Sequence, residues 1–216
     1  MRSKRIVIIG AGGHGKVVAD LCDLLDKWCE IVFLDDRYPA LEIWEEWQVI
    51  GRVSELSQLA VGGCDFALGI GSNTARKELM DEVERCGGAL PSLIHPRAVV
   101  SKRSLVGNGT VIFANAAVNI GTEIGKGDII NTGASVDHDC RLGAGVHICP
   151  GVHLAGSVCV GDLAMIGVGS SVKQGISIGA GAMVGAGAAV VSDIPQGCVV
   201  TGVPAKPIKT AVRSSK

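Results

Sequence analysis

From Ile94 onward, every sixth residue of the chain is a branched aliphatic residue, and no other feature restricts the possible fold as strongly. The seventeen positions from Ile94 to Val190 are all Ile, Leu or Val. A period of six fits neither an α-helix nor an ordinary strand pair, whose side chains repeat every ~3.6 and ~2 residues. It fits a parallel β-helix, in which each hexad forms one flat face and three faces complete one coil. We therefore predict a left-handed parallel β-helix of about five coils, an exception to the usual right-handed crossover.

The residue types at each position of the hexad predict which side chains point into the coil and which lie at its corners. The aliphatic residue points inward, and a small residue four places later, such as Thr110 or Ala134, shares the interior. Gly often follows the aliphatic residue directly, as at Gly107, and we expect it at a corner with positive φ. Residues eighteen apart stack, which places Gly156 against His138. Either a thin ligand fits between them, or Gly156 is one more turn glycine.

The first 93 residues have a different pattern, in which apolar β-branched runs alternate with helical spacing. This alternation predicts a small parallel sheet with helices on its faces. We expect a Rossmann-like α/β domain over 1–93, followed without a flexible linker by the β-helix over 94–216, which includes a short C-terminal tail. The expected strands are 5–10, 30–36 and 65–71, and the expected helices are 17–28 and 72–87.

Composition removes several classes of function. The net charge is −1 and aromatic residues make up 3% of the chain, so neither a nucleic-acid footprint nor a base-stacking surface is expected. No apolar run is long enough for a secretion signal or a membrane span, and no membrane partner is expected. The eight cysteines form no CxxC pair. Scattered buried thiols are typical of a reducing compartment, which favours the cytoplasm.

A glycine-rich turn follows the first strand. Gly10, Gly12 and Gly15 spell GxGxxG, and Asp35 comes twenty residues after Gly15. Such glycines let a phosphate approach backbone N–H groups at a helix N-terminus, and the carboxylate can bind ribose hydroxyls. A nucleotide-linked ligand is favoured over nicotinamide, because about 90 residues leave no room for a second mononucleotide half. A purely structural turn, with Asp35 and Asp36 as strand-end residues, is the alternative.

His138 is the candidate catalytic residue of the repeat. It lies at a non-inward place of its hexad, between Asp137 and Asp139. An imidazole titrates near neutrality, so it can take a proton from an attacking amine or alcohol, and an adjacent carboxylate can fix its tautomer. The alternative is a solvated polar turn. No metal site is expected, because the histidine spacing does not match that of hexapeptide metalloenzymes.

Taken together, the motifs resemble a known family. "IVIIGAGGHGKVVAD", "FLDD", "ALGIGSNTARK", "SLIHPRAVVS", "INTGASVDHDC" and "GVPAK" are similar, in this order, to the sugar acyltransferases of the sialic acid O-acetyltransferase and bacillosamine N-acetyltransferase family. The resemblance runs from about residue 4 to residue 207. It implies a homotrimer that binds acetyl-CoA along the β-helix between two subunits and transfers the acetyl group directly to a sugar.

The resemblance also implies a role for individual residues. His138 matches the catalytic base, and Asp139 matches the acidic neighbour that raises its basicity. Asn131 matches a residue close to the reacting group. The nucleotide-sugar contacts match Gly12, Gly13, His14, Asp35, Asp36 and Gly71. The positions along coenzyme A match His147, Gly156, Val168 and Ala186.

These observations predict an acetyl-CoA-dependent N-acetyltransferase for the 4-amino group of a nucleotide-linked amino sugar, of the UDP-4-amino-4,6-dideoxy type, in bacterial glycan biosynthesis. O-acetylation of sialic acid or a related sugar is the alternative. An NAD(P)-linked oxidoreductase and a non-catalytic nucleotide-binding scaffold are more remote alternatives. The acceptor sugar, its base and the acyl chain length are left open by the residues.

Overall fold

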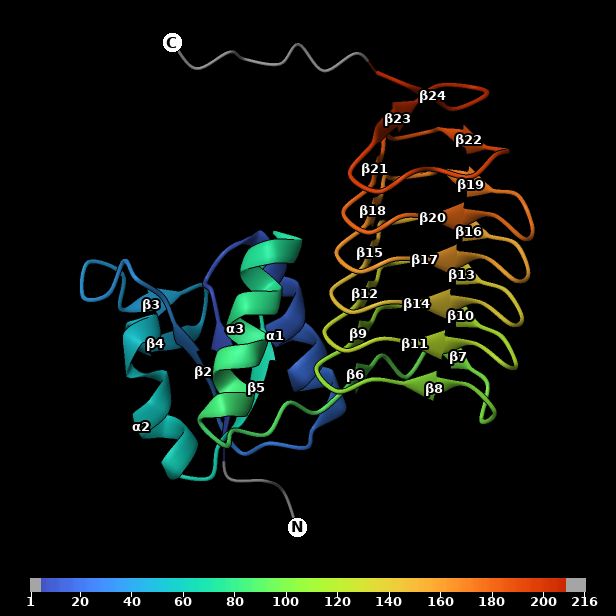
Figure 1. Cartoon of the computed structure of the whole chain (residues 1–216). Coiled ribbons are helices and arrows are strands. Elements are labelled where there is room, and N and C mark those ends of the chain that lie inside the picture. Colours follow the sequence, from blue (N-terminus) through green and yellow to red (C-terminus); the bar gives the residue numbers. More distant parts are fainter. Residues whose placement is uncertain (1–4, 209–216) are drawn as a thin grey trace, which may run out of the picture.

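The front part of the chain is a three-layer α/β unit in a computed structural model that describes residues 5–208 (Figure 1). Its sheet has the strand order β3-β4-β2-β1-β5, and only β3 runs antiparallel to its neighbour. The strands are β1 (Ile6–Ile9), β2 (Ile31–Leu34), β3 (Ile43–Trp44), β4 (Trp47–Gly51) and β5 (Asp65–Leu68). The helices are α1 (Gly13–Leu25), the 3₁₀ turn η1 (Val53–Glu55), α2 (Leu56–Val61) and α3 (Asn73–Arg85).

Alternating strand residues explain the three layers. Ile6 and Ile8 pack on the side of α1, whereas Val7 and Ile9 pack on the side of α2 and α3. The three predicted strands and two predicted helices are confirmed, although α1 begins at Gly13 rather than at residue 17. The β3–β4 hairpin and α2 were not predicted from the sequence.

The rest of the chain winds into a parallel β-helix with three faces. The first face contains β6 (Leu93–Ile94), β9 (Val111–Ile112), β12 (Ile129–Ile130), β15 (His147–Ile148), β18 (Met165–Ile166), β21 (Met183–Val184), β23 (Val199–Thr201) and the antiparallel β24 (Lys206–Pro207). The second contains β7 (Val99–Val100), β10 (Ala117–Val118), β13 (Ser135–Val136), β16 (His153–Leu154), β19 (Ser171–Val172) and β22 (Ala189–Val190). The third contains β8 (Leu105–Val106), β11 (Glu123–Ile124), β14 (Arg141–Leu142), β17 (Cys159–Val160) and β20 (Ser177–Ile178).

From β6 to β19, each strand pairs with the strand eighteen residues later. Val99 lies opposite Ala117, and Ala117 lies opposite Ser135. The aliphatic residues of the repeat are buried from Ile112 to Val190, and the small residues that follow them, such as Ala134 and Ala164, are also fully buried. The predicted inward pattern and the eighteen-residue stacking are therefore confirmed.

The prediction for the glycines of the hexad was wrong. The positive φ falls on the third residue after the aliphatic one, for example at Gly109 and Gly127, in every hexad from 109 to 187. Gly directly after the aliphatic residue is required for another reason, because the next coil is too close. A Cβ on Gly125 lies 2.2 Å from the carbonyl oxygen of Gly143, one coil later.

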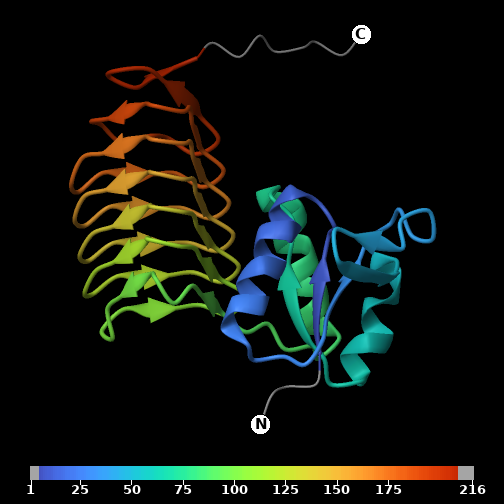
Figure 2. The same cartoon turned by 180° about the vertical axis from the view of Figure 1, so that it is seen from behind.

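The front unit packs on the first face of the coil. Leu93, Val111 and Ile129 project outward from this face, yet they are at most 2% exposed because they join the core around α1. Figure 2 shows α1 lying between the front sheet and the coil. The next residue in this outward column, eighteen after Ile129, is His147.

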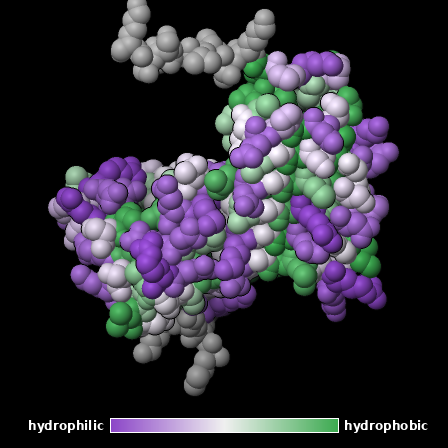
Figure 3. Space-filling model, in the orientation of Figure 1, coloured by the Kyte–Doolittle hydropathy of each residue, from purple (hydrophilic) through white to green (hydrophobic). Residues whose placement is uncertain are grey.

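The two units also differ in surface character. Hydrophilic residues dominate the visible surface of the front unit, whereas the visible surface of the coil mixes both kinds (Figure 3). Among residues 5–208, no helix combines the length and the apolar character that crossing a membrane requires.

Two glycine substitutions separate the two requirements of the hexad. Gly125→Ala drives a Cβ into the backbone of the next coil, and we expect a loss of about 2–3 kcal/mol, as for overpacking. Gly175→Asn puts a side chain into open space at φ +70°, a conformation that Asn115 already adopts in this chain. Because Asn tolerates this region, the second loss stays below about 1 kcal/mol. Urea unfolding at equal protein concentration measures both values, and equal losses contradict this explanation.

Candidate active site

The turn between β1 and α1 leaves an open surface at a helix N-terminus. Gly10 has φ +99°, and a Cβ on Gly15 lies 2.0 Å from the carbonyl oxygen of Gly10, so both positions require glycine. Gly12 and Gly13 have a different reason to be glycine. No atom lies within 4 Å of a Cβ placed on either of them, so the space above them is free. The unpaired N–H groups of the first turn of α1 can bind an anion such as a diphosphate there.

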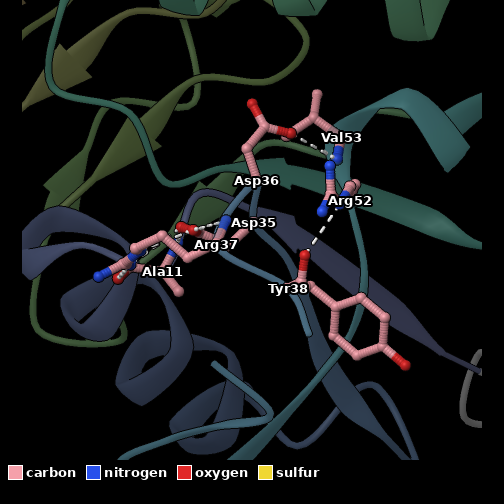
Figure 4. A network of polar contacts seen from close by, with 7 residues as sticks. All are labelled: Ala11, Asp35, Asp36, Arg37, Tyr38, Arg52 and Val53. Atoms are coloured by element: carbon pink, nitrogen blue, oxygen red, sulfur yellow. Dashed lines mark hydrogen bonds and ion pairs between the residues drawn. The ribbon is translucent and has the colours of Figure 1, made fainter. Parts of the chain in front are cut away.

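Asp35 fixes this turn from the end of β2 (Figure 4). Its Oδ2 accepts hydrogen bonds from the Ala11 N–H at 2.8 Å and from Arg37 Nη2, and its Oδ1 accepts from Arg37 Nε at 2.7 Å. The hydrogen bond from Arg37 is the main reason that the pKa of Asp35 falls to about 2. Asp36 accepts from the Val53 N–H at 3.2 Å. Asp35 is the residue expected to contact the nucleotide, but both of its carboxylate oxygens already accept hydrogen bonds from the protein itself.

Arg76 connects the front unit to the coil. It is 1% exposed, and it donates hydrogen bonds to the carbonyl oxygens of Gly71, Gly127 and Gly145 at 3.2, 2.8 and 2.8 Å. Burial lowers its pKa to about 10, and the nearby Asp128 opposes this shift. Gly71, the last predicted contact of the front unit, has open space at its Cβ position. Arg76 therefore sets the position of Gly71 relative to the coil.

Two predicted site histidines meet where α1 reaches the coil. The His14 ring lies edge-on to Phe113, with centroids 5.7 Å apart, and His147 Nε2 lies 3.2 Å from Asn131 Nδ2. His14 Nε2 and His147 Nδ1 are buried without a hydrogen-bond partner among residues 5–208. Burial is the largest cause that lowers the pKa of each ring to about 4. Both imidazoles are therefore neutral at pH 7.

His138 lies in the turn between β13 and β14, and its side chain is 54% exposed. Its Nδ1 lies 2.8 Å from Asp139 Oδ2. A carboxylate can only accept, so the neutral ring has its proton on Nδ1 and a free lone pair on Nε2. The hydrogen bond that His138 Nδ1 donates to Asp139 is the first cause that raises the pKa of His138, and the charges of Asp137 and Asp139 add to it.

The space above Gly156 is not a ligand gap, contrary to one reading of the sequence. A Cβ on Gly156 lies 2.5 Å from Cε1 and Nε2 of His138, so the imidazole itself fills this space. In the coil below, a Cβ on Gly121 lies 2.4 Å from Asp139 Oδ1. Two glycines, one on each side, thus make room for the histidine and its carboxylate.

Val168 and Ala186 lie on the corner between the first and second faces and are eighteen residues apart. Asn131 lies on the same corner in an earlier coil. Val168 is 54% exposed, and its carbonyl oxygen accepts a hydrogen bond from Gly187 in the next coil. Gly156 and His138, in contrast, lie on the corner between the second and third faces. The positions expected along coenzyme A therefore do not form one continuous surface within a single chain.

The predicted site is thus divided within one chain. The front unit covers the first face, and its residues lie with His147 and Asn131 beside that face. His138 lies at the one corner that does not border the first face. The whole second face separates His138, Asp139 and Gly156 from the other predicted site residues.

Sequence reasoning missed two residues that organise the site, Arg37 and Arg76. Both lie inside quoted or adjoining motifs, but their partners are mostly backbone carbonyls and a carboxylate two residues away, which leave no spacing signal. Within residues 5–208, no group of three or more His, Cys, Asp and Glu side chains could hold a metal ion. In that same region the front sheet ends at β5 and has no second mononucleotide half, which argues against a nicotinamide cofactor.

Comparisons with known proteins agree with this geometry. Residues 5–83 match the family model described as the PglD N-terminal domain. A stretch of 113 residues is 38% identical to UDP-N-acetylbacillosamine N-acetyltransferase from Bacillus subtilis, and it covers 51% of this chain. The match spans about half (52%) of the length of that curated relative.

Two solved structures match almost the whole chain. The acetyltransferase domain of PglB from Neisseria gonorrhoeae, in complex with acetyl coenzyme A, is 43% identical with a TM-score of 0.92, over 95% of this chain and 100% of that chain. A histidine mutant of perosamine N-acetyltransferase from Caulobacter crescentus, in complex with CoA and GDP-perosamine, is 40% identical with a TM-score of 0.88, over 95% and 97%.

The buried histidine pair predicts how stability depends on pH. Free imidazole has a pKa of 6.5, whereas the rings of His14 and His147 have pKa values of about 4. As the pH falls from 6.5 to 4, the unfolded chain binds protons first, so the free energy of unfolding decreases, by about 3 kcal/mol for one such ring. The lowered pKa of Asp35 also contributes to the free energy of unfolding, but this contribution is lost only as the pH falls from 3.8 toward 2, outside this window.

The measurement compares urea unfolding of the wild type and His147→Gln between pH 7 and pH 4.5. The variant should lose less stability on acidification, because one titrating ring is absent. The raised pKa of Asp128 acts in the opposite direction, but it is common to both proteins and cancels in the difference. Parallel curves for the two proteins contradict the prediction.

Proposed function

The chain belongs to the PglD-type family of sugar acetyltransferases, and we propose that it transfers the acetyl group of acetyl-CoA to the 4-amino group of a nucleotide-linked amino sugar. The observation that carries this proposal is the pairing of His138 with Asp139, at 2.8 Å, with the Nε2 lone pair free. The acceptor is of the UDP-4-amino-4,6-dideoxy type, for bacterial surface or glycoprotein glycans. One relative is named as a UDP-N-acetylbacillosamine N-acetyltransferase, and the other was solved with GDP-perosamine, so both involve a nucleotide-linked sugar.

The two parts of the chain have different tasks in this proposal. The front unit, residues 1–93, holds the diphosphate at the N-terminus of α1, over Gly12 and Gly13, with the sugar passing Gly71 toward the coil. The open space at all three glycines supports this placement. The coil, from residue 94 onward, holds acetyl-CoA along its corners, at the positions of Gly156, Val168 and Ala186.

The chemistry is a direct transfer. The sugar amine attacks the thioester carbonyl, a C–N bond forms, and His138 Nε2 removes the proton from the amine. The C–S bond then breaks, coenzyme A leaves as the thiol after taking up a proton, and the acetamido sugar is released. Asp139 stabilises the imidazolium that forms in between. Backbone N–H groups stabilise the oxyanion.

An acyl-enzyme on Cys140 is a poorer mechanism. The Cys140 side chain is buried, and its Sγ donates a hydrogen bond to the Ala155 carbonyl at 3.3 Å. Burial is the main cause that raises the pKa of this thiol. Because the thiolate is the nucleophile, such a cysteine is badly suited to attack a thioester at neutral pH.

The divided site supports a homotrimer. The second-to-third corner of one subunit, with His138, meets the first-to-second corner of the next, with Asn131 and the front unit. Four of the six outward residues on the second face, Ala117, Ser135, Ser171 and Ala189, are small and allow the coils to approach closely around a threefold axis, and Val99 and His153 are the two larger ones. Each site then takes its base from one subunit and its nucleotide sugar from another.

We place this trimer in the bacterial cytoplasm. Eight cysteines in one chain of 216 residues suit a reducing compartment, and acetyl-CoA as donor suits the same location.

Replacing the base tests the mechanism directly. His138→Asn removes the proton acceptor from an exposed side chain, so folding should be unaffected and kcat should fall about 10²–10⁴-fold. CoA release, followed with a thiol reagent, measures the rate with UDP- and GDP-linked 4-amino sugars. The acceptor that gives the higher kcat/KM identifies the nucleotide. A His138→Asn rate within tenfold of wild type removes the proposed base.

Mixed trimers test the division of the site between subunits. Gly71→Asp places a carboxylate in the open space that the sugar is expected to pass, and it abolishes acceptor binding. His138→Asn and Gly71→Asp trimers are each inactive, but trimers reassembled from a 1:1 mixture regain about a quarter of the wild-type sites. A mixture with no recovered activity shows that each site lies within a single chain.

A further inference from the structure

Asp137, the other carboxylate beside His138, has no part in the mechanism above, yet the structure holds it in place. Its Oδ1 accepts a hydrogen bond from Asn119 Nδ2 at 2.7 Å and from the backbone N–H of His138 at 2.8 Å. Asn119 lies eighteen residues earlier, in the coil below, at the same place of its face. One carboxylate oxygen thus connects the backbone of His138 to the previous coil.

We propose that Asn119 and Asp137 are a positioning pair for His138. Through them the coil below sets where the imidazole points. The proposal rests on the proposed function of His138 as the base. It assigns a role to Asp137 that the sequence analysis left as one side of a polar turn.

The turn needs such an anchor because its geometry is demanding. Asp139 has φ +59°, at the place of the hexad where most coils have glycine. Its side chain lies over Gly121 and the His138 ring lies over Gly156, each in space that a Cβ on the glycine would occupy. A small rotation of the 137–139 backbone breaks the 2.8 Å contact between Nδ1 and Oδ2. A hydrogen bond to the His138 N–H resists this rotation directly.

Asp137 also acts through its charge. Its pKa is lowered, first by the hydrogen bond from Asn119 and then by that from the His138 N–H, so it stays ionised at neutral pH. Its negative charge helps to raise the pKa of His138. The neighbouring turns below and above, residues 119–122 and 155–157, have no titratable side chain. Asp137 and Asp139 are therefore the charged groups beside the ring within this stack.

The pair lies on the surface of the single chain and not in its core. Asn119 and Asp137 line a groove on the second face, together with Ser135 and His153. Both members of the pair form their bond in an exposed position. Substitutions here can therefore change the geometry of the turn without opening a cavity in the coil.

Two variants separate position from charge. Asn119→Ala removes the anchor and leaves the carboxylate, so kcat at its pH plateau should fall about tenfold to a hundredfold, with KM for acetyl-CoA unchanged. Asp137→Asn keeps an acceptor for the His138 N–H and removes the charge. Its acidic limb in the pH dependence of kcat should move to lower pH, because the His138 pKa loses one raising contribution.

The exchanged pair is the rescue variant. Asn119→Asp combined with Asp137→Asn keeps one amide–carboxylate hydrogen bond between the coils, so it should recover most of the kcat lost in Asn119→Ala. Asn108→Ala is the matched control, since Asn108 is an exposed asparagine of the same coil stack, in a turn beside the front unit. It should retain wild-type kcat and the wild-type pH dependence.

The outcomes distinguish this proposal from the one on which it rests. An inactive His138→Asn variant with wild-type kcat in Asn119→Ala overturns the positioning pair and leaves the base intact. An unshifted acidic limb in Asp137→Asn overturns the role of its charge. Full activity of His138→Asn overturns the base itself. Thermal unfolding midpoints equal to wild type in all variants show that the rate changes arise in the site.

Discussion

The stacking of residues eighteen apart determines the contacts that surround His138. It brings Asn119 to Asp137 and places Gly121 under Asp139 and Gly156 over the ring of His138. Because each coil repeats the backbone of the previous one, a side chain at a corner meets whatever the sequence places one coil away. The chemistry of His138 is therefore set by three coils and not by its own hexad alone.

The eighteen-residue stacking also explains which features could be predicted from the sequence. A period of six in the aliphatic residues determines the inward positions, so the core and the eighteen-residue pairing could be predicted and are observed. The corner could not be predicted from glycine counts, because glycine serves two purposes. At Gly127 it allows a positive φ, and at Gly125 it allows the next coil to approach. Composition alone does not distinguish these purposes.

The docking of the front unit is the part that the sequence left undetermined. Arg76 binds carbonyl oxygens of two separate coils, and any residue type can offer a carbonyl, so no partner motif marks the contact. The outward residues of the first face also gave no sign of the docking. From the sequence, Leu93 and Val111 are outward positions of the repeat and would be exposed, but α1 buries them. His14 and His147 were predicted as binding residues, but their burial and lowered pKa values follow from this docking.

The rigid docking has a consequence for how activity relates to assembly. Because the buried Arg76 and the apolar column hold the front unit on the first face, a nucleotide sugar bound there cannot reach the opposite corner of its own coil by a swing of the domain. A flexible linker would permit such a swing and make a single chain sufficient. With the front unit fixed, the proposed function requires acceptor and base to meet across a boundary between chains. The close packing that stabilises each chain thus makes the proposed activity depend on the trimer.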